Sequence, residues 1–313
     1  MLIKSIRNYL SFSCQIACLL SPFSASAEFR LLQDFRAHGS LSGKVTAFHE
    51  WNSPDRILVL DSNGHLLRYS LDTSRVIESV TVRLEAGCEF SELRSMKWAS
   101  PFFVGEASVC VYRPESRRIT PAPVPAFQSG TYGSTFLRET ATTLQFLING
   151  RPWPKGGEGS GFVSILELNK GTRQSTIRPL YIGVPGFSGG MAIEGDSLFV
   201  TAWIYQTSSS RVYSLNLATV QSRVEKQETA RFLDEASPLP LDLKGNTGLL
   251  QVNPIELLYD NSQQEGAGES FRVNRGSGAI STAQIPQGCK IIGHRAAEWL
   301  LFCENSELRM GAF

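Results

Sequence analysis

Residues 57–73 read ILVLDSNGHLLRYSLDT, and residues 198–219 read LFVTAWIYQTSSSRVYSLNLAT. Each segment is an apolar run, a polar turn and a second run that contains Tyr-Ser-Leu. Val, Ile, Leu, Phe and Tyr favour strands, whereas Asn, Gly and Ser favour the turns between them. The same arrangement returns without the tyrosine at 144–172. The chain therefore repeats a unit built from paired β-strands.

The repeat has a nearly regular spacing. One core-strand residue can be assigned to each unit, and successive ones are separated by 44, 44, 53, 58 and 44 residues. These residues are Val59, Phe103, Leu147, Val200, Leu258 and Phe302. A spacing of about 40–50 residues is typical of four-stranded propeller blades, each of which covers its neighbour's apolar face. We therefore expect an all-β, six-bladed β-propeller of four-stranded antiparallel blades, with seven blades as the alternative count.

The first 27 residues have the pattern of a signal peptide. Lys4 and Arg7 precede a moderately apolar stretch, and Ala25-Ser26-Ala27 supplies a cleavage site of small residues. We expect residues 1–27 to be removed and residues 28–313 to form one propeller domain. The protein would then be periplasmic or secreted.

The remaining chain offers no membrane span and little net charge. No later run reaches the ~20 apolar residues that a membrane helix requires, so the mature protein is expected to be soluble. A lipoprotein attached through Cys18 is an alternative. Loss of Lys4 and Arg7 moves the formal net charge from +1 to about −1, which gives no electrostatic basis for binding nucleic acid.

Four cysteines remain after processing, at positions 88, 110, 289 and 303. Two of them have similar surroundings, since Gly87-Cys88, Arg94 and Trp98 have the same offsets as Gly288-Cys289, Arg295 and Trp299. Export favours disulfides, and three connectivities are open to four cysteines. The repeat favours pairing within a blade, Cys88 with Cys110 and Cys289 with Cys303. Four buried thiols are the alternative.

The sequence predicts neither a metal nor another cofactor. No C-x-x-C pair with a nearby histidine completes a zinc site.

One segment resembles a known group of propellers. Residues 190–219, GMAIEGDSLFVTAWIYQTSSSRVYSLNLAT, are similar to blades of the YVTN, NHL and quinoprotein-like group. Residues 57–80 are a second match, and 98–119 and 297–310 are weaker ones. The resemblance implies the propeller architecture and, in exported bacterial members, a binding or assembly role. It transfers no cofactor residues, because this chain lacks a quinone-docking tryptophan repeat and a recurring acidic metal cluster.

Two short motifs resemble elements of trypsin-like serine proteases. Residues 186–190 read GFSGG, like the sequence around the nucleophile, and residues 45–49 read VTAFH, like the histidine element. Ser188 and His49 would then be the nucleophile and the base. The orienting aspartate is missing from the stretch where that family carries it. The alternative for residues 186–190 is a glycine-rich turn that leads into a strand.

The connections between second and third strands differ in length. They are long at 149–161, 203–210 and 260–270 and short in the other units. Equivalent turns emerge on one face of a propeller, and loops on a rigid scaffold commonly carry specificity. The long connections offer planar and cationic side chains: Arg151, Trp153, Lys155, Trp203 and Tyr205. We expect them to bind a protein, peptide or glycan.

These observations favour an exported binding, interaction or assembly module over an enzyme. The first alternative is a propeller-scaffold hydrolase, lactonase-like or sugar-active, with a site at the ring axis. The second is the serine protease. Axial carboxylates and histidines that converge would favour the first, and contact between Ser188 and His49 would favour the second.

Overall fold

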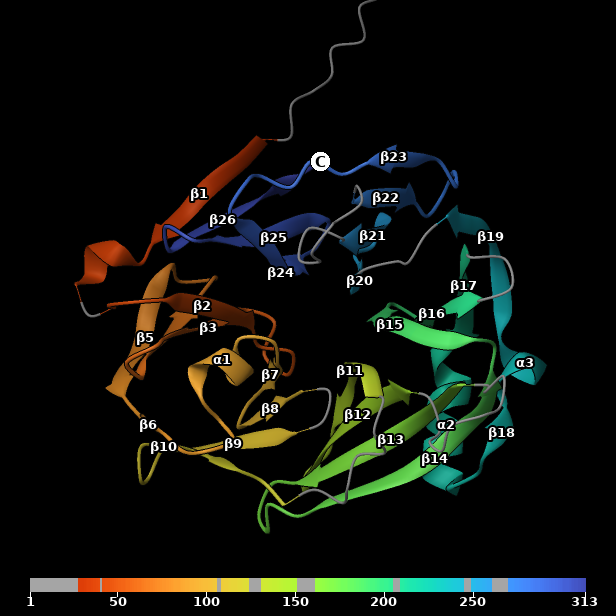
Figure 1. Cartoon of the computed structure of the whole chain (residues 1–313), viewed down its shortest axis with the longest axis horizontal. Helices are drawn as coiled ribbons and strands as arrows, with labels where there is room; N and C mark the ends of the chain where they lie inside the picture. The colour runs from red at the N-terminus through yellow and green to blue at the C-terminus, as the bar shows by residue number, and fades with distance from the viewer. Residues whose placement is uncertain are drawn as a thin grey trace, which may run out of the picture.

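The computed structural model of the chain describes residues 28–39, 41–105, 108–123, 131–150, 161–204, 209–244, 249–260 and 270–313. The expected signal peptide lies outside these residues. The described part forms six mostly antiparallel sheets, arranged as blades around one axis (Figure 1). The protein is therefore an all-β, six-bladed propeller.

The strands follow the chain from blade 1 to blade 6, each blade running from the axis outward. Blade 1 contains β2 (Val45–His49), β3 (Arg56–Asp61), β4 (His65–Ser70) and β5 (Arg75–Thr81). Blade 2 contains β7 (Lys97–Ala99), β8 (Phe102–Val104), β9 (Val109–Arg113) and β10 (Arg118–Pro121), with β6 (Arg83–Leu84) added outside. Blade 3 contains β11 (Thr131–Glu139), β12 (Thr143–Gly150), β13 (Gly161–Asn169) and β14 (Ser175–Val184), with β18 (Ala230–Arg231) added outside.

The second half of the ring repeats the pattern. Blade 4 contains β15 (Phe187–Glu194), β16 (Ser197–Ile204), β17 (Ser209–Asn216) and β19 (Ser237–Lys244). Blade 5 contains β20 (Leu249–Val252), β21 (Glu256–Asp260), β22 (Phe271–Asn274) and β23 (Ile280–Thr282). Blade 6 contains β24 (Cys289–Arg295), β25 (Glu298–Cys303), β26 (Glu307–Ala312) and, outermost, β1 (Glu28–Asp34).

The six core residues predicted from the sequence all lie in the second strand of a blade. These strands are β3, β8, β12, β16, β21 and β25, and each of the six side chains is buried. The count of six blades is confirmed. The second strand of every blade is covered on both faces and is therefore apolar along its length. This made one such strand per blade recognisable in the sequence, and its spacing gave the number of blades.

Strand β3 shows why the runs read as continuously apolar. Ile57 and Val59 pack in a cluster with side chains of blade 6, whereas Leu58 and Leu60 pack in a cluster with side chains of blade 2. Successive side chains of a strand point to opposite faces. Because both faces of a blade are covered by neighbours, the strand needs an apolar residue at every position.

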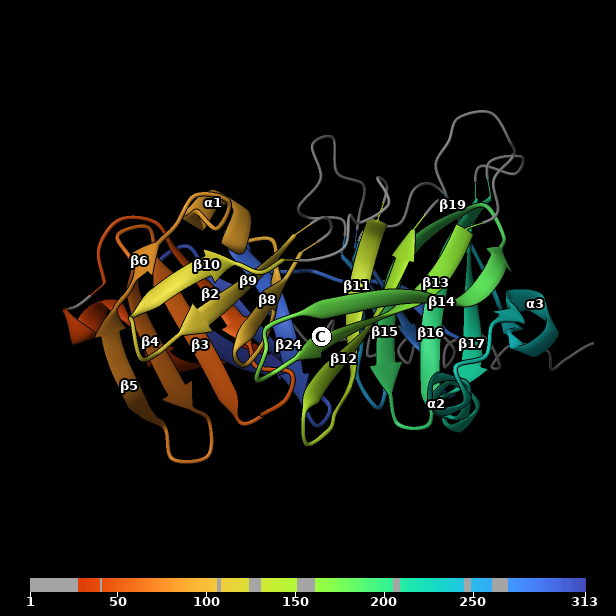
Figure 2. The same ribbon diagram turned by 90° about the horizontal axis from the view of Figure 1, so that it is seen from below.

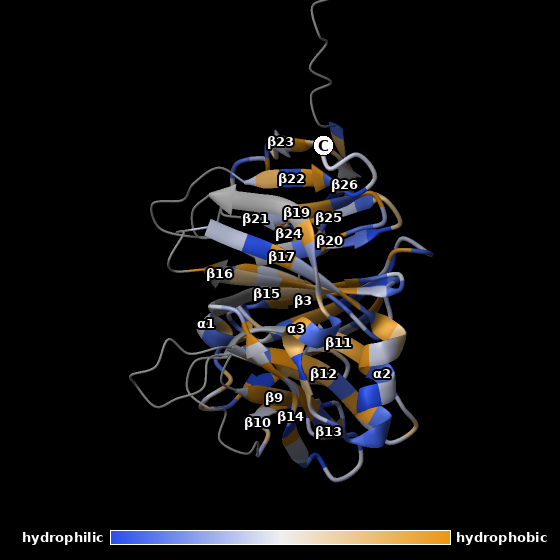
Figure 3. Cartoon of the chain, turned by 90° about the vertical axis from the view of Figure 1, so that its right-hand side faces the viewer, coloured by the Kyte–Doolittle hydropathy of each residue, from blue (hydrophilic) through white to orange (hydrophobic). Residues whose placement is uncertain are grey.

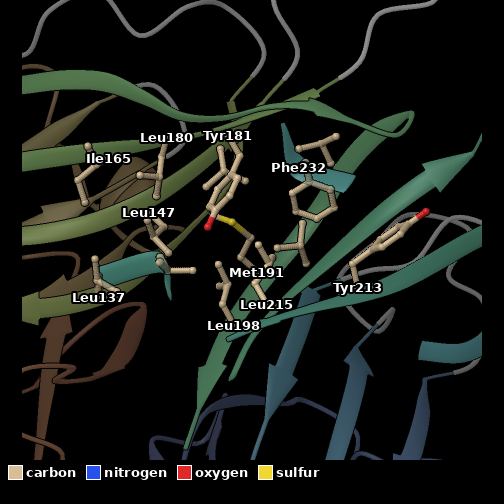
Figure 4. Close-up of a cluster of buried hydrophobic side chains, with 14 of the residues drawn as sticks. Leu137, Leu147, Ile165, Leu180, Tyr181, Met191, Leu198, Tyr213, Leu215 and Phe232 are labelled. Atoms are coloured by element: carbon tan, nitrogen blue, oxygen red, sulfur yellow. The ribbon is translucent and has the colours of Figure 1, made fainter. Parts of the chain in front are cut away.

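The largest cluster lies between blades 3 and 4. Figure 4 shows Leu147 and Leu180 of blade 3 on one side and Leu198 and Leu215 of blade 4 on the other. Phe232 fills the outer end and contacts Tyr181 and Tyr213 edge to face, at ring-centroid distances of 6.1 and 5.4 Å. Figure 3 shows hydrophobic residues along the blade strands and hydrophilic residues on α2 (Leu217–Lys226).

Residues 223–236 (RVEKQETARFLDEA) read as a charged helical stretch in the sequence, but the helices of the structure have other bounds. Helix α2 begins earlier, where the side chain of Asn216 accepts the Thr219 amide, and ends at Gln227 in a left-handed conformation. Strand β18 and the short helix α3 (Phe232–Glu235) follow. Pairing of β18 with β14 of blade 3 interrupts the helix. A tertiary contact therefore overrides local helix propensity here.

The two other helical segments are short. Segment η1 (Arg36–His38) follows β1, and α1 (Phe90–Leu93) precedes β7. Among the described residues, no helix has the length and apolar character to cross a membrane.

The ring closes through its N-terminal strand. Strand β1 pairs antiparallel with β26, from Glu28 opposite Ala312 to Asp34 opposite Glu307 (Figure 1). Phe35 then enters the core, fully buried, and its ring centroid lies 5.4 Å from that of Tyr69 in blade 1. Blade 6 is thus completed by a segment from the opposite end of the chain.

Both disulfides expected within blades are present. Cys88, just before α1, is bonded to Cys110 in β9. Cys289 and Cys303 lie opposite each other on β24 and β25 and are bonded. Each bond closes a short loop inside one blade.

Deletion of residues 28–36 should lower the melting temperature of the whole ring, because it opens blade 6 and removes the Phe35 anchor. Phe35→Ala alone should cost about 3–5 kcal/mol. Leu31→Ala is the matched control, because Leu31 lies on the same segment but is 52% exposed. Calorimetry of the three variants checks this. A deletion variant that melts like the parent would contradict the role of β1.

Candidate functional site

The first strands of the six blades surround the axis and define its two ends. The parallel bridge between Glu50 and Trp98 shows that blades 1 and 2 run their inner strands in the same direction. We call the end where the inner strands begin the start end and the opposite one the finish end. Helix α1 lies before an inner strand and α2 after a third strand, and Figure 2 shows them on opposite sides of the ring.

A histidine and a glutamate meet across the axis at the finish end. His294 Nε2 of β24 lies 3.4 Å from Glu194 Oε2 of β15. Blade 5 separates these two blades, so the contact joins parts of the ring that are not neighbours. His294 Nδ1 lies 3.0 Å from the Ala296 carbonyl. A carbonyl only accepts hydrogen bonds, so Nδ1 carries a proton.

His49 lies beside this pair but is buried. Its Nε2 donates to the Pro54 carbonyl at 2.8 Å. A methyl group added at Gly293 would overlap the His49 ring, so β24 passes against it. Burial, and next the nearby His294, hold the pKa of His49 below its usual value, although the Pro54 carbonyl opposes this. His49 is therefore a neutral, packed histidine.

This arrangement bears on the two enzyme alternatives, the axial hydrolase and the serine protease. A histidine and a carboxylate do converge at the axis, as the hydrolase alternative requires. His49 and Ser188, in contrast, lie on the inner strands of blades 1 and 4, which face each other across the ring. The side chain of Ser188 is outside the described residues. His49 donates its Nε2 to the Pro54 carbonyl, and the described residues place no nucleophile as its partner.

A cleft of about 460 Å³ opens between blades 1 and 2. Its walls come from the outer strands β4, β5 and β9 and from the β9–β10 turn. The lining residues are His65, Glu78, Ser79, Val80, Thr81, Tyr112, Pro114 and Arg117. Most of them present polar atoms, so the cleft offers hydrogen bonds in several directions.

A chain of charged and polar side chains links blades 1 and 2 at the cleft. Arg68 contacts both carboxylate oxygens of Glu50 at 2.9 Å, and Glu50 is 1% exposed. Arg68 also reaches Glu78 at 3.4 Å, and the Tyr112 hydroxyl donates to Glu78 at 2.9 Å. Burial and the Glu78 carboxylate raise the pKa of Tyr112 to about 12. The hydroxyl therefore stays a donor at neutral pH and holds Glu78 in place.

Asp61 holds His65, which lies on the same blade 1 side of the cleft as Glu78. The Asp61 carboxylate accepts backbone amides of Ser42, Asn63 and His65, and lies 2.9 Å from His65 Nδ1. Burial opposes ionisation of Asp61, but these bonds together lower its pKa. His65 follows the short β3–β4 turn and is thereby oriented at the cleft. Both walls are preorganised by side chains that belong to rigid strands.

The binding residues predicted from the sequence cannot be placed around either region. Arg151, Trp153, Lys155 and Tyr205 lie outside the described residues. Trp203 is near the end of β16, where its backbone pairs with Phe187 and Ser210, and its side chain is also outside the described part. The assignment of the long connections to binding stays a prediction.

Sequence reasoning missed the residues that the ring brings together. Glu194 and His294 are 100 positions apart and belong to no shared motif. Glu78 and Tyr112 come from different blades and are likewise ordinary strand residues in the sequence. Trp98 and Trp299, in contrast, are fully buried and serve packing. In the described part of the chain, no three His, Cys, Asp or Glu side chains are placed to hold a metal ion.

Comparisons with known proteins identify no family for this chain. No protein-family model matches the chain, and no curated protein does. Similar solved structures include U3-55K, with 9% identity and a TM-score of 0.44 over 91% of this chain and 98% of that one. The Myceliophteria thermophila Cps50 (Swd1) β-propeller domain has 11% identity and a TM-score of 0.44 over 91% and 100%. An oligogalacturonate lyase in complex with manganese has 11% identity and a TM-score of 0.44 over 92% and 96%. Structures of such low similarity give no basis for assigning an activity to this chain.

His49 should make the fold acid-sensitive below about pH 6.5. Its pKa is lower in the folded chain, near His294 and Asp55, than in the unfolded chain. The unfolded chain therefore binds an additional proton as the pH falls, and the free energy of unfolding decreases. Glutamine in His49→Gln can still donate to the Pro54 carbonyl but does not titrate. The free energy of unfolding of this variant should therefore decrease less than that of the parent between about pH 6.5 and about pH 5. Urea unfolding across this range checks it. If the free energy of unfolding depends on pH equally in both proteins, His49 does not cause the acid sensitivity.

Proposed function

We propose that this protein is an exported β-propeller that acts by binding, and that the cleft between blades 1 and 2 receives the ligand. The proposal rests on the shape and the polar lining of this cleft. Ligand sites are concave, largely preformed and few per protein, with polar groups that fix orientation. Here the polar groups are held by the Asp61 bonds and by the Glu50–Arg68–Glu78–Tyr112 chain.

The lining indicates a polar ligand. Glu78 accepts hydrogen bonds, Arg117 donates them, and the hydroxyls of Ser79 and Thr81 do both. Tyr112 and Pro114 add flat apolar faces. A glycan or a polar peptide fits this mixture of directional polar groups and planar faces. The long second-to-third connections would extend the same binding surface over blades 3 to 5.

Export is the proposed setting. Disulfides persist in oxidising compartments and are rare in the cytosol. The two bonds within blades 2 and 6 support a periplasmic or secreted location. The signal pattern of residues 1–27 agrees with this.

A second candidate is a propeller-scaffold enzyme with an axial site. The contact of His294 with Glu194 across the ring favours it, because a carboxylate that orients a histidine is a common element of general base catalysis. Binding is preferred, because the described neighbours already occupy both ring nitrogens of His294. Loss of any hydrolytic activity in His294→Gln, with the cleft variant below unaffected, would reverse this preference.

Blocking the cleft should abolish binding without loosening the ring. Arg117 is exposed in the β9–β10 turn, lines the cleft and lies near Tyr112, so Arg117→Trp fills the cleft from the blade 2 side. Thr176→Trp is the matched control, because Thr176 is exposed on β14, the fourth strand of blade 3. Measured on defined glycans and immobilised peptides, Arg117→Trp should weaken binding by about tenfold or more. Thr176→Trp should bind like the parent, and both should melt like the parent.

The same assay distinguishes binding in the cleft from binding on the long connections. If Arg117→Trp binds normally and the double variant Trp153→Ala, Trp203→Ala does not, the ligand sits on the long connections and the cleft assignment is wrong. If neither change affects binding, the assigned face is wrong as a whole.

A further inference from the structure

The outer edges of the blades differ in what covers them. Strand β10 of blade 2 carries β6 along its outer edge, and β14 of blade 3 carries β18, each added strand running parallel to its neighbour. The outermost strands of the other blades are β5, β19, β23 and β1, and no described strand pairs with their outer sides (Figure 1). The ring therefore already accepts an added strand at two of its outer edges.

Strand β5 is the uncovered edge with the least protection against pairing. Edge strands are commonly protected by prolines, by bulges or by shortness. β19 contains two prolines, β23 has three residues, and β1 is interrupted by a bulge between Leu31 and Gln33. β5 has seven residues without a proline, and Ile77 on it is 50% exposed. From Glu78 to Thr81 it pairs with β4 without a bulge.

The backbone of this stretch directs hydrogen-bonding groups outward. Just after β5, the Val82 amide donates to the Gly64 carbonyl of the β3–β4 turn. In an antiparallel pair only every second residue bonds to the neighbouring strand, so Val80 also faces β4. The N–H and C=O groups of Ser79 and Thr81 then point to the free edge. In the described part of the chain, no other element takes up these groups.

The cleft between blades 1 and 2 follows this edge. Four consecutive residues of β5, Glu78 to Thr81, line it, and Tyr112, Pro114 and Arg117 of blade 2 lie on the other side. Successive side chains of a strand point to opposite faces of the sheet, so four in a row line one cleft only along the edge of the strand. The cleft therefore has room for a chain that runs beside β5.

Both ends of this edge are cationic. Arg75 begins β5, and Arg83 begins β6 directly after it, and both are exposed. The Arg83 amide donates to the Arg117 carbonyl at 2.9 Å, so these two residues are adjacent. Among the described residues, none of the three arginines has a carboxylate within ion-pair distance. Acidic side chains complement such a surface.

We propose that an extended, acidic segment of another protein adds as a strand to β5 and lies in the cleft. Its backbone bonds to Ser79 and Thr81, and its acidic side chains lie beside the arginines. Hydrogen bonds of the main chain at a sheet edge provide affinity in this mode of peptide recognition. The inference rests on the proposed function, because it uses the same cleft, and it selects a peptide over a glycan.

A second copy of this chain fits the edge less well. Two β5 strands paired antiparallel around Ser79 would bring Arg75 of each copy near Arg83 of the other. Like charges opposite each other destabilise a strand pair. The charges at this edge therefore favour an acidic partner over self-association.

Backbone-modified peptides test strand addition without changing the protein. The probe is a peptide of alternating valine and serine, as long as β5 and flanked by aspartates, and its binding is measured by calorimetry. A strand directs alternate amides to its partner. Methylation of one alternate set of peptide amides should therefore weaken binding by about tenfold or more, and methylation of the other set should leave it nearly unchanged. Equal affinities of the two methylated peptides, or no binding of the unmodified peptide, would overturn the proposal.

Proline substitution tests the same contact from the protein side. Ser79→Pro removes an outward amide and keeps the ladder with β4, so it should weaken peptide binding by about tenfold or more. Thr282→Pro is the matched control on the exposed edge of β23. Since the Ala283 amide donates to the Ser270 carbonyl, the amide of Thr282 also points outward. The control should bind like the parent, and the two variants should have similar melting temperatures.

The charge of the partner is tested separately. Arg83→Gln should weaken binding of the aspartate-flanked peptide, most strongly at low salt, and should have less effect on the same peptide without aspartates. Equal effects on both peptides would contradict an acidic partner.

The remaining outcomes separate this inference from the proposed function. Ligand binding that Arg117→Trp abolishes and Ser79→Pro leaves unchanged would overturn strand addition but retain the cleft, and binding of glycans alone would do the same. Normal binding by Arg117→Trp would overturn the cleft assignment itself. Dimers of the parent that Ser79→Pro abolishes would make a second copy the occupant and overturn the acidic partner.

Discussion

The structure depends on closing the ring. Every blade covers both faces of its inner strands with the neighbouring blades, so an open ring would leave two apolar faces in water. The antiparallel pair of β1 and β26 prevents this, because it completes blade 6 with the first described residues of the chain. Phe35 extends the effect into the core, where it contacts Tyr69 of blade 1 and Phe302 of blade 6. Loss of the pair would expose a free sheet edge as well as those faces.

Closure also explains why polar and charged groups are tolerated between blades. The indole of Trp299 in blade 6 donates to Glu256 of blade 5 at 2.6 Å, and Lys290 of blade 6 donates to Thr46 of blade 1. Buried polar groups are costly unless each finds its partner. The Lys290–Thr46 bond joins the last blade to the first, so it forms only when the ring is shut. The cleft likewise combines two blades, because the Arg68 and Glu78 side chains of blade 1 meet Tyr112 of blade 2.

The sequence predicted the features that repeat along the chain, but not the contacts that form between distant residues when the blades make a ring. The apolar second strands were visible because each is buried on both faces and must be apolar along its length. The disulfide pairs were visible because their surroundings repeat. Glu194 and His294 were invisible as a pair, because only the circular arrangement brings β15 and β24 to one axis. Lys290 and the lining of the cleft were missed for the same reason. The long connections were assigned to binding by length, and the structure leaves that assignment as a proposal.

Hydrogen exchange of backbone amides in the intact protein tests closure most directly. If β1 completes blade 6, its amides that pair with β26 open only with the ring, and their protection should match that of the central strand β25. The account predicts slow exchange in both strands, lost together when denaturant unfolds the ring. Fast exchange throughout residues 28–34, with β25 still protected, would show that β1 is a frayed terminus and would contradict the claim that the ring depends on it.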